Sequence, residues 1–157
     1  MSAYSDAVRM LARRELSEAQ IRQRLARRDH SADAIDAAVE RLREQRAIDD
    51  TRVAEAIART QILSKRRWGP RAEQYIVRAG ISRETARRVA REVTQSVDPD
   101  TQIEAALAKR LRGREPIADD KQLRRLYRYL VGQGYETDRI IRVLRSRMPS
   151  RSPLSER

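Results

Sequence analysis

The chain has 157 residues, of which 37% are charged and 39% apolar, and its net charge is +12. This length suits one domain or a few small helical modules. The sequence has no Cys, which excludes disulfides and thiolate metal sites, and no apolar run near the roughly 18 residues of a membrane span. We therefore expect a cytoplasmic protein. The positive charge favours polyanionic partners, since Lys and Arg displace counterions from phosphates, although it can also serve only as a solubilising surface.

Apolar residues at helical spacing predict three helices in the first third of the chain. The first covers about residues 5–14, Ser17 caps the second and Ser31 caps the third. A serine at this position accepts a hydrogen bond from an otherwise unpaired backbone N–H. His30 is the only histidine. Its place in the pattern predicts an apolar packing position and no catalytic role.

The middle third repeats this plan. A long helix is expected from the aspartates at 49–50 to Arg67, and the segment 68–70 breaks it with a Gly-Pro pair. The next helix ends at Gly80, a typical position for the left-handed residue after a helix, and Ser82 caps the third.

The last third begins a helix at Asp98 that runs to Leu111. The aspartates at 119–120 open the next helix, which ends at Gly134, and a final helix stops at Pro149. The tail, residues 149–157, is rich in Ser, Arg and Pro and is expected to be disordered.

The three thirds share one apolar register when they are aligned on Ser31, Ser82 and Glu136, which are 51 and 54 residues apart. Five compared positions in each third are apolar throughout: Ile21, Leu25, Ile35, Ala38, Val39; Ala72, Ile76, Ala86, Val89, Ala90; Leu126, Leu130, Ile140, Val143, Leu144. The pattern predicts an all-α fold, an elongated array of three tandem three-helix repeats. We place the repeats at residues 1–47, 48–97 and 98–148.

The ordered motifs of these repeats resemble the RecX family. They are LARRELSE at 11–18, IDD at 48–50 with VAEA at 53–56, GPR at 69–71, GIS at 80–82, and LYRYL at 126–130 with GY at 134–135. Each motif is weak alone, but their order and spacing hold over residues 3–148. The resemblance implies a regulatory protein whose partners are RecA, the RecA–DNA filament, and single- and double-stranded DNA. It implies that the protein modulates the ATPase, strand-exchange and coprotease activities of RecA, with inhibition the expected direction. It predicts a monomer without cofactors.

Basic residues of the second and third repeats are the candidates for a DNA or filament surface, because Arg forks bind phosphates and neighbouring aromatics stack on bases. They are Lys65, Arg66, Arg67, Arg71, Arg78, Arg124, Arg125, Arg128, Arg139 and Arg142. For any single Arg, a solvated outer face is the alternative. Trp68 is a candidate anchor for a partner, or else a staple between two helices. The first repeat is richer in acids, so it is interpreted as a surface for basic protein rather than phosphate.

Catalysis finds little support in the sequence. The aspartate pairs at 49–50 and 119–120 precede helices, where N-caps are needed, so neither is predicted to bind a metal. There is no glycine-rich phosphate loop and no nucleophile–base set. We therefore expect a protein that is not an enzyme. The alternative function is a RecA-independent DNA-binding protein of the helix-turn-helix type.

Overall fold

The computed structural model describes residues 1–114 and 116–149. Within them the chain forms nine α-helices and no strand, as the sequence predicts, and in addition one short π-helix. None of these helices has both the length and the apolar character needed to cross a membrane. Most of the predicted disordered tail, from residue 150 on, lies outside the described residues.

The first three helices form the first unit: α1 (Ala3–Arg13), α2 (Glu18–Ala26) and α3 (Ala32–Glu44). Ser17 and Ser31 cap α2 and α3 as expected, each accepting a hydrogen bond from the backbone N–H three residues later. Gln20 completes a capping box at α2 by bonding back to the Ser17 backbone N–H.

The second unit contains α4 (Asp50–Arg59), the π-helix η1 (Thr60–Ser64), α5 (Gly69–Arg78) and α6 (Arg83–Gln95). The expectation of one long α-helix to Arg67 was wrong, because η1 replaces its last turns. Ala54, Ala58 and Ile62 are fully buried and four residues apart. At 3.6 residues per turn such positions drift by about 40° per step, and the wider π turn returns Ile62 to the core side.

The third unit contains α7 (Pro99–Leu111), α8 (Asp120–Gly132) and α9 (Thr137–Ser146). Asp98 and Asp119 cap α7 and α8 through their side chains. At the start of α9, Glu136 occupies the N-cap position without a side-chain hydrogen bond.

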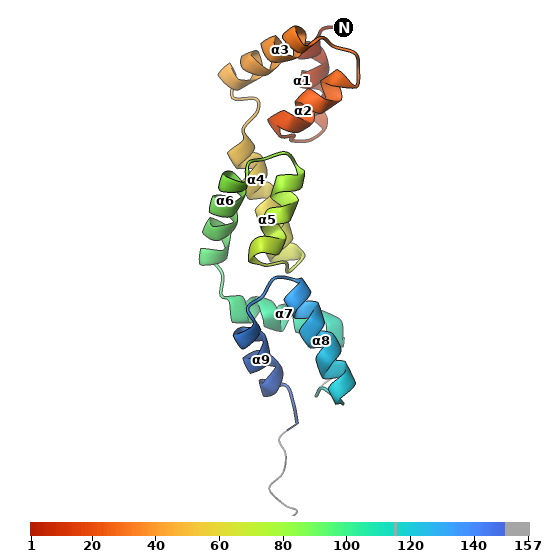
Figure 1. The fold of residues 1–157 in the computed structure, drawn as a ribbon, viewed down its shortest axis with the longest axis vertical. Helices are drawn as coiled ribbons and strands as arrows, with labels where there is room; N and C mark the ends of the chain where they lie inside the picture. The colour runs from red at the N-terminus through yellow and green to blue at the C-terminus, as the bar shows by residue number, and fades with distance from the viewer. Residues whose placement is uncertain (115, 150–157) are drawn as a thin grey trace, which may run out of the picture.

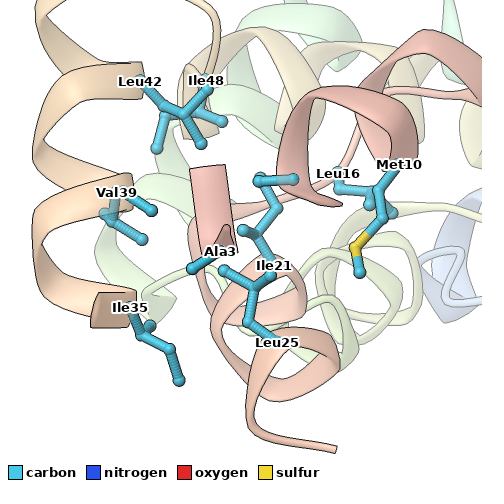
Figure 2. Packing of buried hydrophobic residues seen from close by; sticks show 11 residues of the cluster. Ala3, Met10, Leu16, Ile21, Leu25, Ile35, Val39, Leu42 and Ile48 are labelled. Carbon is cyan, nitrogen blue, oxygen red and sulfur yellow. The ribbon is translucent and has the colours of Figure 1, made fainter. Parts of the chain in front are cut away.

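Each unit has its own core. The fifteen register positions, five in each unit, are all buried. Figure 2 shows the first core, where Met10 of α1, Ile21 and Leu25 of α2, and Val39 and Leu42 of α3 converge. Ile48, which we assigned to the second repeat, packs into this first core, so the boundary at 47–48 stays a prediction.

The three units follow one another along the long axis of the molecule (Figure 1). The main helix–helix contacts lie within units, so neighbouring units meet through loops and helix ends. In Figure 1 the second helices α2, α5 and α8 lie along one side, and the third helices α3, α6 and α9 along the other. We call α2, α5 and α8 the second-helix column.

The junction between the first and second units is polar. The Ser17 hydroxyl, which is fully buried, donates to the carbonyl of Ala79 at the end of α5. The Glu18 backbone N–H donates to Asp50 over 2.9 Å. Gly80, at φ +82°, lies so close to Ala19 that a Cβ at this position would overlap it. Glycine is therefore required here for both space and backbone conformation.

The junction between the second and third units uses the same positions with different chemistry. The Trp68 backbone N–H, directly before α5, donates to the carbonyl of Gln133 at the end of α8 over 2.6 Å. The Trp68 ring stacks on Tyr135 at 5.7 Å between centroids. Gly134, at φ +97°, takes the place of Gly80, and a Cβ there would overlap the Trp68 carbonyl. Trp68 thus packs against the cores of both units.

The sequence predicts an apolar packing position for His30, and the structure agrees with this prediction only in part. Its register equivalents Ile81 and Tyr135 are buried core residues. His30 also lies largely inside, but its Nε2 is hydrogen-bonded to Asp6 Oδ2 at 2.8 Å. Asp6 is itself buried and additionally paired with Arg28 at 3.2 Å. The first core therefore closes at this end with a polar pair, because an unpaired buried carboxylate would be costly.

Candidate nucleic-acid interface

Three of the five predicted basic residues of the second unit gather around one aromatic ring, Tyr75 on α5. The guanidinium carbons of Arg67, Arg78 and Arg71 lie 4.4, 4.9 and 5.8 Å from the ring centre. Arg67 also bonds to Gln61, and Arg71 to Gln74 over 3.1 Å. We call Tyr75 with Arg67, Arg71 and Arg78 the Tyr75 cluster. Cation–π contacts hold these guanidinium groups beside the ring, and Arg78, whose side chain is exposed, can still donate to an oxygen of a partner.

The third unit has a corresponding arrangement around Tyr129 on α8. The guanidinium of Arg110, near the end of α7, lies 3.8 Å from the centre of the Tyr129 ring. A hollow of about 440 Å³ opens beside it, lined by this ring and by the basic end of α7: Lys109, Arg110, Leu111, Arg112 and Arg114. We call this the Tyr129 hollow.

The two sites occupy equivalent places in their units. Tyr75 lies seven residues before Ser82, and Tyr129 lies seven before Glu136. By the same count Arg71 corresponds to Arg125. In both units, therefore, one face of the second helix carries an Arg and, four residues later, a Tyr. Residues four apart share a helix face, so the repeat places a cationic and aromatic pair at matching points of the second-helix column.

Arg124, Arg125 and Arg128 lie exposed on α8. Among the residues that the structure describes, no carboxylate forms an ion pair with any of the three. Their charge is available to a partner, and Arg125 lies on the face that also carries Tyr129. Helix α8, which carries these three residues, lies in the same column as α5, which carries Tyr75, Arg71 and Arg78 (Figure 1).

Arg139 and Arg142 lie elsewhere, on α9 in the opposite column. Both pair with Asp100 of α7, at 3.1 and 3.3 Å, and Arg139 also approaches Glu136 at 3.7 Å. Their charge is already partly balanced. The structure therefore does not bring them together with the Tyr75 cluster, and the surface proposed below does not depend on them.

Lys65, Arg66 and Trp68 are held by the junction with the third unit. The carbonyl of Lys65 accepts from the Gln133 amide over 3.2 Å, while its side chain is exposed. The Arg66 carbonyl accepts from the Tyr135 hydroxyl over 2.8 Å, and its guanidinium donates to Gln102 over 2.8 Å. Burial raises the pKa of the Tyr135 phenol, which therefore stays protonated as the donor. The stacking of Trp68 accounts for its position as a staple between units, and a contact with a partner stays a prediction.

The aspartate pairs carry structural roles. Asp49 and Asp119 each accept from the backbone N–H three residues on, at 3.2 and 2.7 Å, and Asp50 bonds across the junction to Glu18. Within residues 1–114 and 116–149, no three His, Asp or Glu side chains gather in a way that could hold a metal ion.

Tyr75 and Arg110 are members of the candidate interface that the sequence reasoning did not single out. The signal was present, because Tyr75 and Tyr129 fall at the same place in the repeat register. An alignment of apolar core positions does not reveal these rings, because they are half-buried on an outer face. Arg110 comes from α7, and no local spacing reveals that it reaches a ring on α8.

Comparison with known proteins supports the resemblance seen in the sequence. Residues 3–42 match the family model described as the first three-helix domain of RecX. The regulatory protein RecX of Syntrophotalea carbinolica is 31% identical over 134 residues, covering 85% of this chain and 88% of its own. The corresponding protein of Thermus thermophilus is 36% identical over 135 residues, covering 85% of this chain and 83% of its own.

Two crystal structures share the fold. That of RecX from Lactobacillus salivarius superposes with a TM-score of 0.77 at 18% identity, over 92% of this chain and 93% of its own. A second structure, of regulatory protein RecX, gives a TM-score of 0.74 at 19% identity, over 92% of this chain and 70% of its own. RecX proteins are regulatory and non-enzymatic, in line with the expectation from the sequence. With its sequence relatives and its three-helix units, the chain belongs to the RecX family of regulatory proteins.

Proposed function

We propose that this chain binds RecA filaments on DNA and lowers their ATPase, strand-exchange and coprotease activities. RecA enters as the partner that the family resemblance implies. The observation that carries the proposal is the repeated placement of an Arg and, four residues later, a Tyr on one face of a second helix: Arg71 with Tyr75 on α5, and Arg125 with Tyr129 on α8. An elongated array with equivalent binding points along one side suits a partner that is itself a long, regular polymer.

The chemistry of these points suits a nucleic-acid strand in such a filament. Guanidinium groups bind phosphate oxygens in pairs, and exposed aromatic faces stack on bases without regard to sequence. Several weak binding points on one chain act together, because once the first is bound the others meet the strand at high effective concentration. The column therefore provides affinity along a filament without a deep binding pocket.

The test uses RecA filaments assembled on single-stranded DNA, with the full chain titrated in and ATP hydrolysis measured. We expect hydrolysis to fall as the protein is added, and the protein to sediment with the filaments. The double variant Arg71→Gln/Arg78→Gln, which removes two charges from the Tyr75 cluster, is expected to need a several-fold higher concentration for the same effect.

The matched control is Arg88→Gln/Arg91→Gln, which removes two charges from α6 in the opposite column. It should act within about twofold of the parent, since interactions between exposed charges beyond about 10 Å are largely screened by salt. Unchanged hydrolysis without co-sedimentation would refute the proposal. Sequence-preferring binding to duplex DNA with no effect on RecA would support the helix-turn-helix alternative instead.

A further inference from the structure

A third cationic site lies on the first unit, where the ends of α1 and α2 come together. It is a hollow of about 520 Å³ beside Met10. Its remaining lining residues are all arginines: Arg9, Arg13, Arg14, Arg24, Arg27 and Arg28. We call it the first-unit arginine hollow.

The charge of this hollow is mostly unbalanced. Arg28 pairs with Asp6, but none of the other arginines of the hollow forms an ion pair with any described residue. Four of the eight acids of the unit lie on α3. The ion pairs of these acids engage arginines outside the hollow, Arg22 with Asp36 and Arg43 with Glu40, and both arginines also bond to Glu18 of α2. The hollow is thus lined by cations, and no acid of the unit lies among its lining residues.

The favourable interaction of cations with the C-terminal ends of two helices does not by itself explain this cluster of arginines. Cations near a helix C-terminus interact favourably with its dipole, and Arg13 and Arg27 have such positions. Further arginines add repulsion, since Arg9 with Arg13 and Arg24 with Arg28 are like charges four residues apart. A bound polyanion would relieve that repulsion.

The repeat register gives a second, independent argument. Arg24 lies seven residues before Ser31, the place that Tyr75 and Tyr129 hold in their units, and Arg27 corresponds to Arg78 of the Tyr75 cluster. In the first and third units, the hollow forms between this face of the second helix and the basic end of the first helix. The first-unit arginine hollow is therefore the equivalent of the Tyr129 hollow, with Arg in place of the stacking ring.

We infer that the first-unit arginine hollow binds backbone phosphates of a nucleic-acid strand. All of its polar lining groups are guanidinium donors, and it lacks an aromatic ring, so it suits phosphates and not bases. The site extends the binding column from α8 and α5 to α2 at the far end of the molecule (Figure 1). The inference rests on the DNA binding in the proposed function, but it does not require RecA.

The experiment measures binding of the full chain, without RecA, to a fluorescent single-stranded oligonucleotide over a series of salt concentrations. Each phosphate contact contributes about 0.7 to the slope of log affinity against log salt. The variant Arg13→Gln/Arg24→Gln removes two contacts, so its slope should be shallower by about 1.4. Between about 50 and 200 mM salt, the parent should lose about sevenfold more affinity than this variant.

The control is Arg41→Gln/Arg46→Gln, which removes the same charge from α3 and the turn after it. It should keep the slope of the parent, and melting curves must show that both variants fold. Equal slopes for the two variants would overturn the inference. A second outcome would also overturn the inference: the Arg13→Gln/Arg24→Gln variant binds the oligonucleotide like the parent but no longer sediments with RecA filaments. The hollow would then bind an acidic protein surface instead of phosphates. If the parent itself binds no oligonucleotide, DNA binding as a whole fails.

Discussion

The two junctions of the array use the same positions of the repeat but hold their units together differently. Between the first and second units, the Ser17 hydroxyl bonds to a carbonyl at the end of α5, and Glu18 bonds to Asp50. Between the second and third, Trp68 makes the equivalent backbone bond and also stacks on Tyr135. One junction is polar, and the other adds a large apolar contact.

This difference predicts unequal coupling along the array. Apolar burial stabilises by roughly 25 cal/mol per Å², whereas a hydrogen bond exchanged with water contributes about 1 kcal/mol net. In a linear array, the interface between neighbours determines whether two units unfold together. We therefore expect the second and third units to unfold as one cooperative block, and the first unit to open more independently.

The largest effect is expected from Gly134→Ala at the apolar junction. Alanine at φ +97° costs about 1–2 kcal/mol, and its Cβ would also displace the Trp68 carbonyl, so we expect a loss of about 3 kcal/mol. Gly113→Ala is the control, since Gly113 has φ +79° but open space around it, and should lose only about 1 kcal/mol. Urea unfolding curves measure both. Equal losses of unfolding free energy in the two variants would show that the junction does not require the close approach of Gly134 to the Trp68 carbonyl.

Trp68→Ala is expected to cost about 2 kcal/mol, below the roughly 3–5 kcal/mol of a fully buried aromatic because Trp68 is half-buried. The loss should uncouple the second and third units. Hydrogen exchange should therefore change from one common opening rate in α5 and α8 to two separate rates. Trp68→Phe retains a ring and should preserve the common rate. Persistent common exchange in the alanine variant would contradict the role of the stacked pair.

Ser17→Ala should have a smaller effect, about 1–2 kcal/mol, from the lost cap of α2 and the orphaned Ala79 carbonyl. Exchange should accelerate in the first unit while α8 is unaffected. Ser31→Ala is a suitable control, because Ser31 caps α3 without bonding to another unit. A loss no greater than that of the control would mean that the polar junction adds nothing to the cap.

The smallest expected effect is a loss of stability of the first unit at low pH. The hydrogen bond from His30, and then the charge of Arg28, hold the pKa of Asp6 below its usual value of 3.8, against the opposing effect of burial. A carboxylate whose pKa is lower in the folded state than in the unfolded state stabilises the fold at pH values above the unfolded-state pKa. This stabilisation is lost as the pH falls through the folded-state pKa. The first unit should thus loosen before the other two below about pH 4. Exchange measured against pH tests this, and Asp6→Asn should flatten the profile.

Much of the architecture could be predicted from the sequence. Helix caps such as Ser17 and Ser82, and the buried register positions, are set by local chemistry within a few residues of each other. The π-helix after Arg59 could not be foreseen, because it depends on how three evenly spaced apolar residues meet a core assembled from other helices.

The candidate site was predicted only in part. Basic residues are visible in a sequence, but whether their charge is balanced depends on distant segments. Arg142 meets Asp100 from 42 residues away, whereas the arginines around Tyr75 meet no acid in the part of the chain that the structure describes. The first-unit arginine hollow was obscured because its unit also carries many acids, and only the fold separates the two signs.

One position also gives the array a direction. Gly80 and Gly134 leave room for the preceding unit, and their equivalent in the first unit is Asp29, which has the same left-handed backbone at φ +63°. Its Cβ occupies the space into which a preceding unit would fit. A unit placed before the first one through the same contact would therefore meet the Asp29 Cβ, so the close approach that Gly80 and Gly134 allow inside the array is blocked at this face of the first unit.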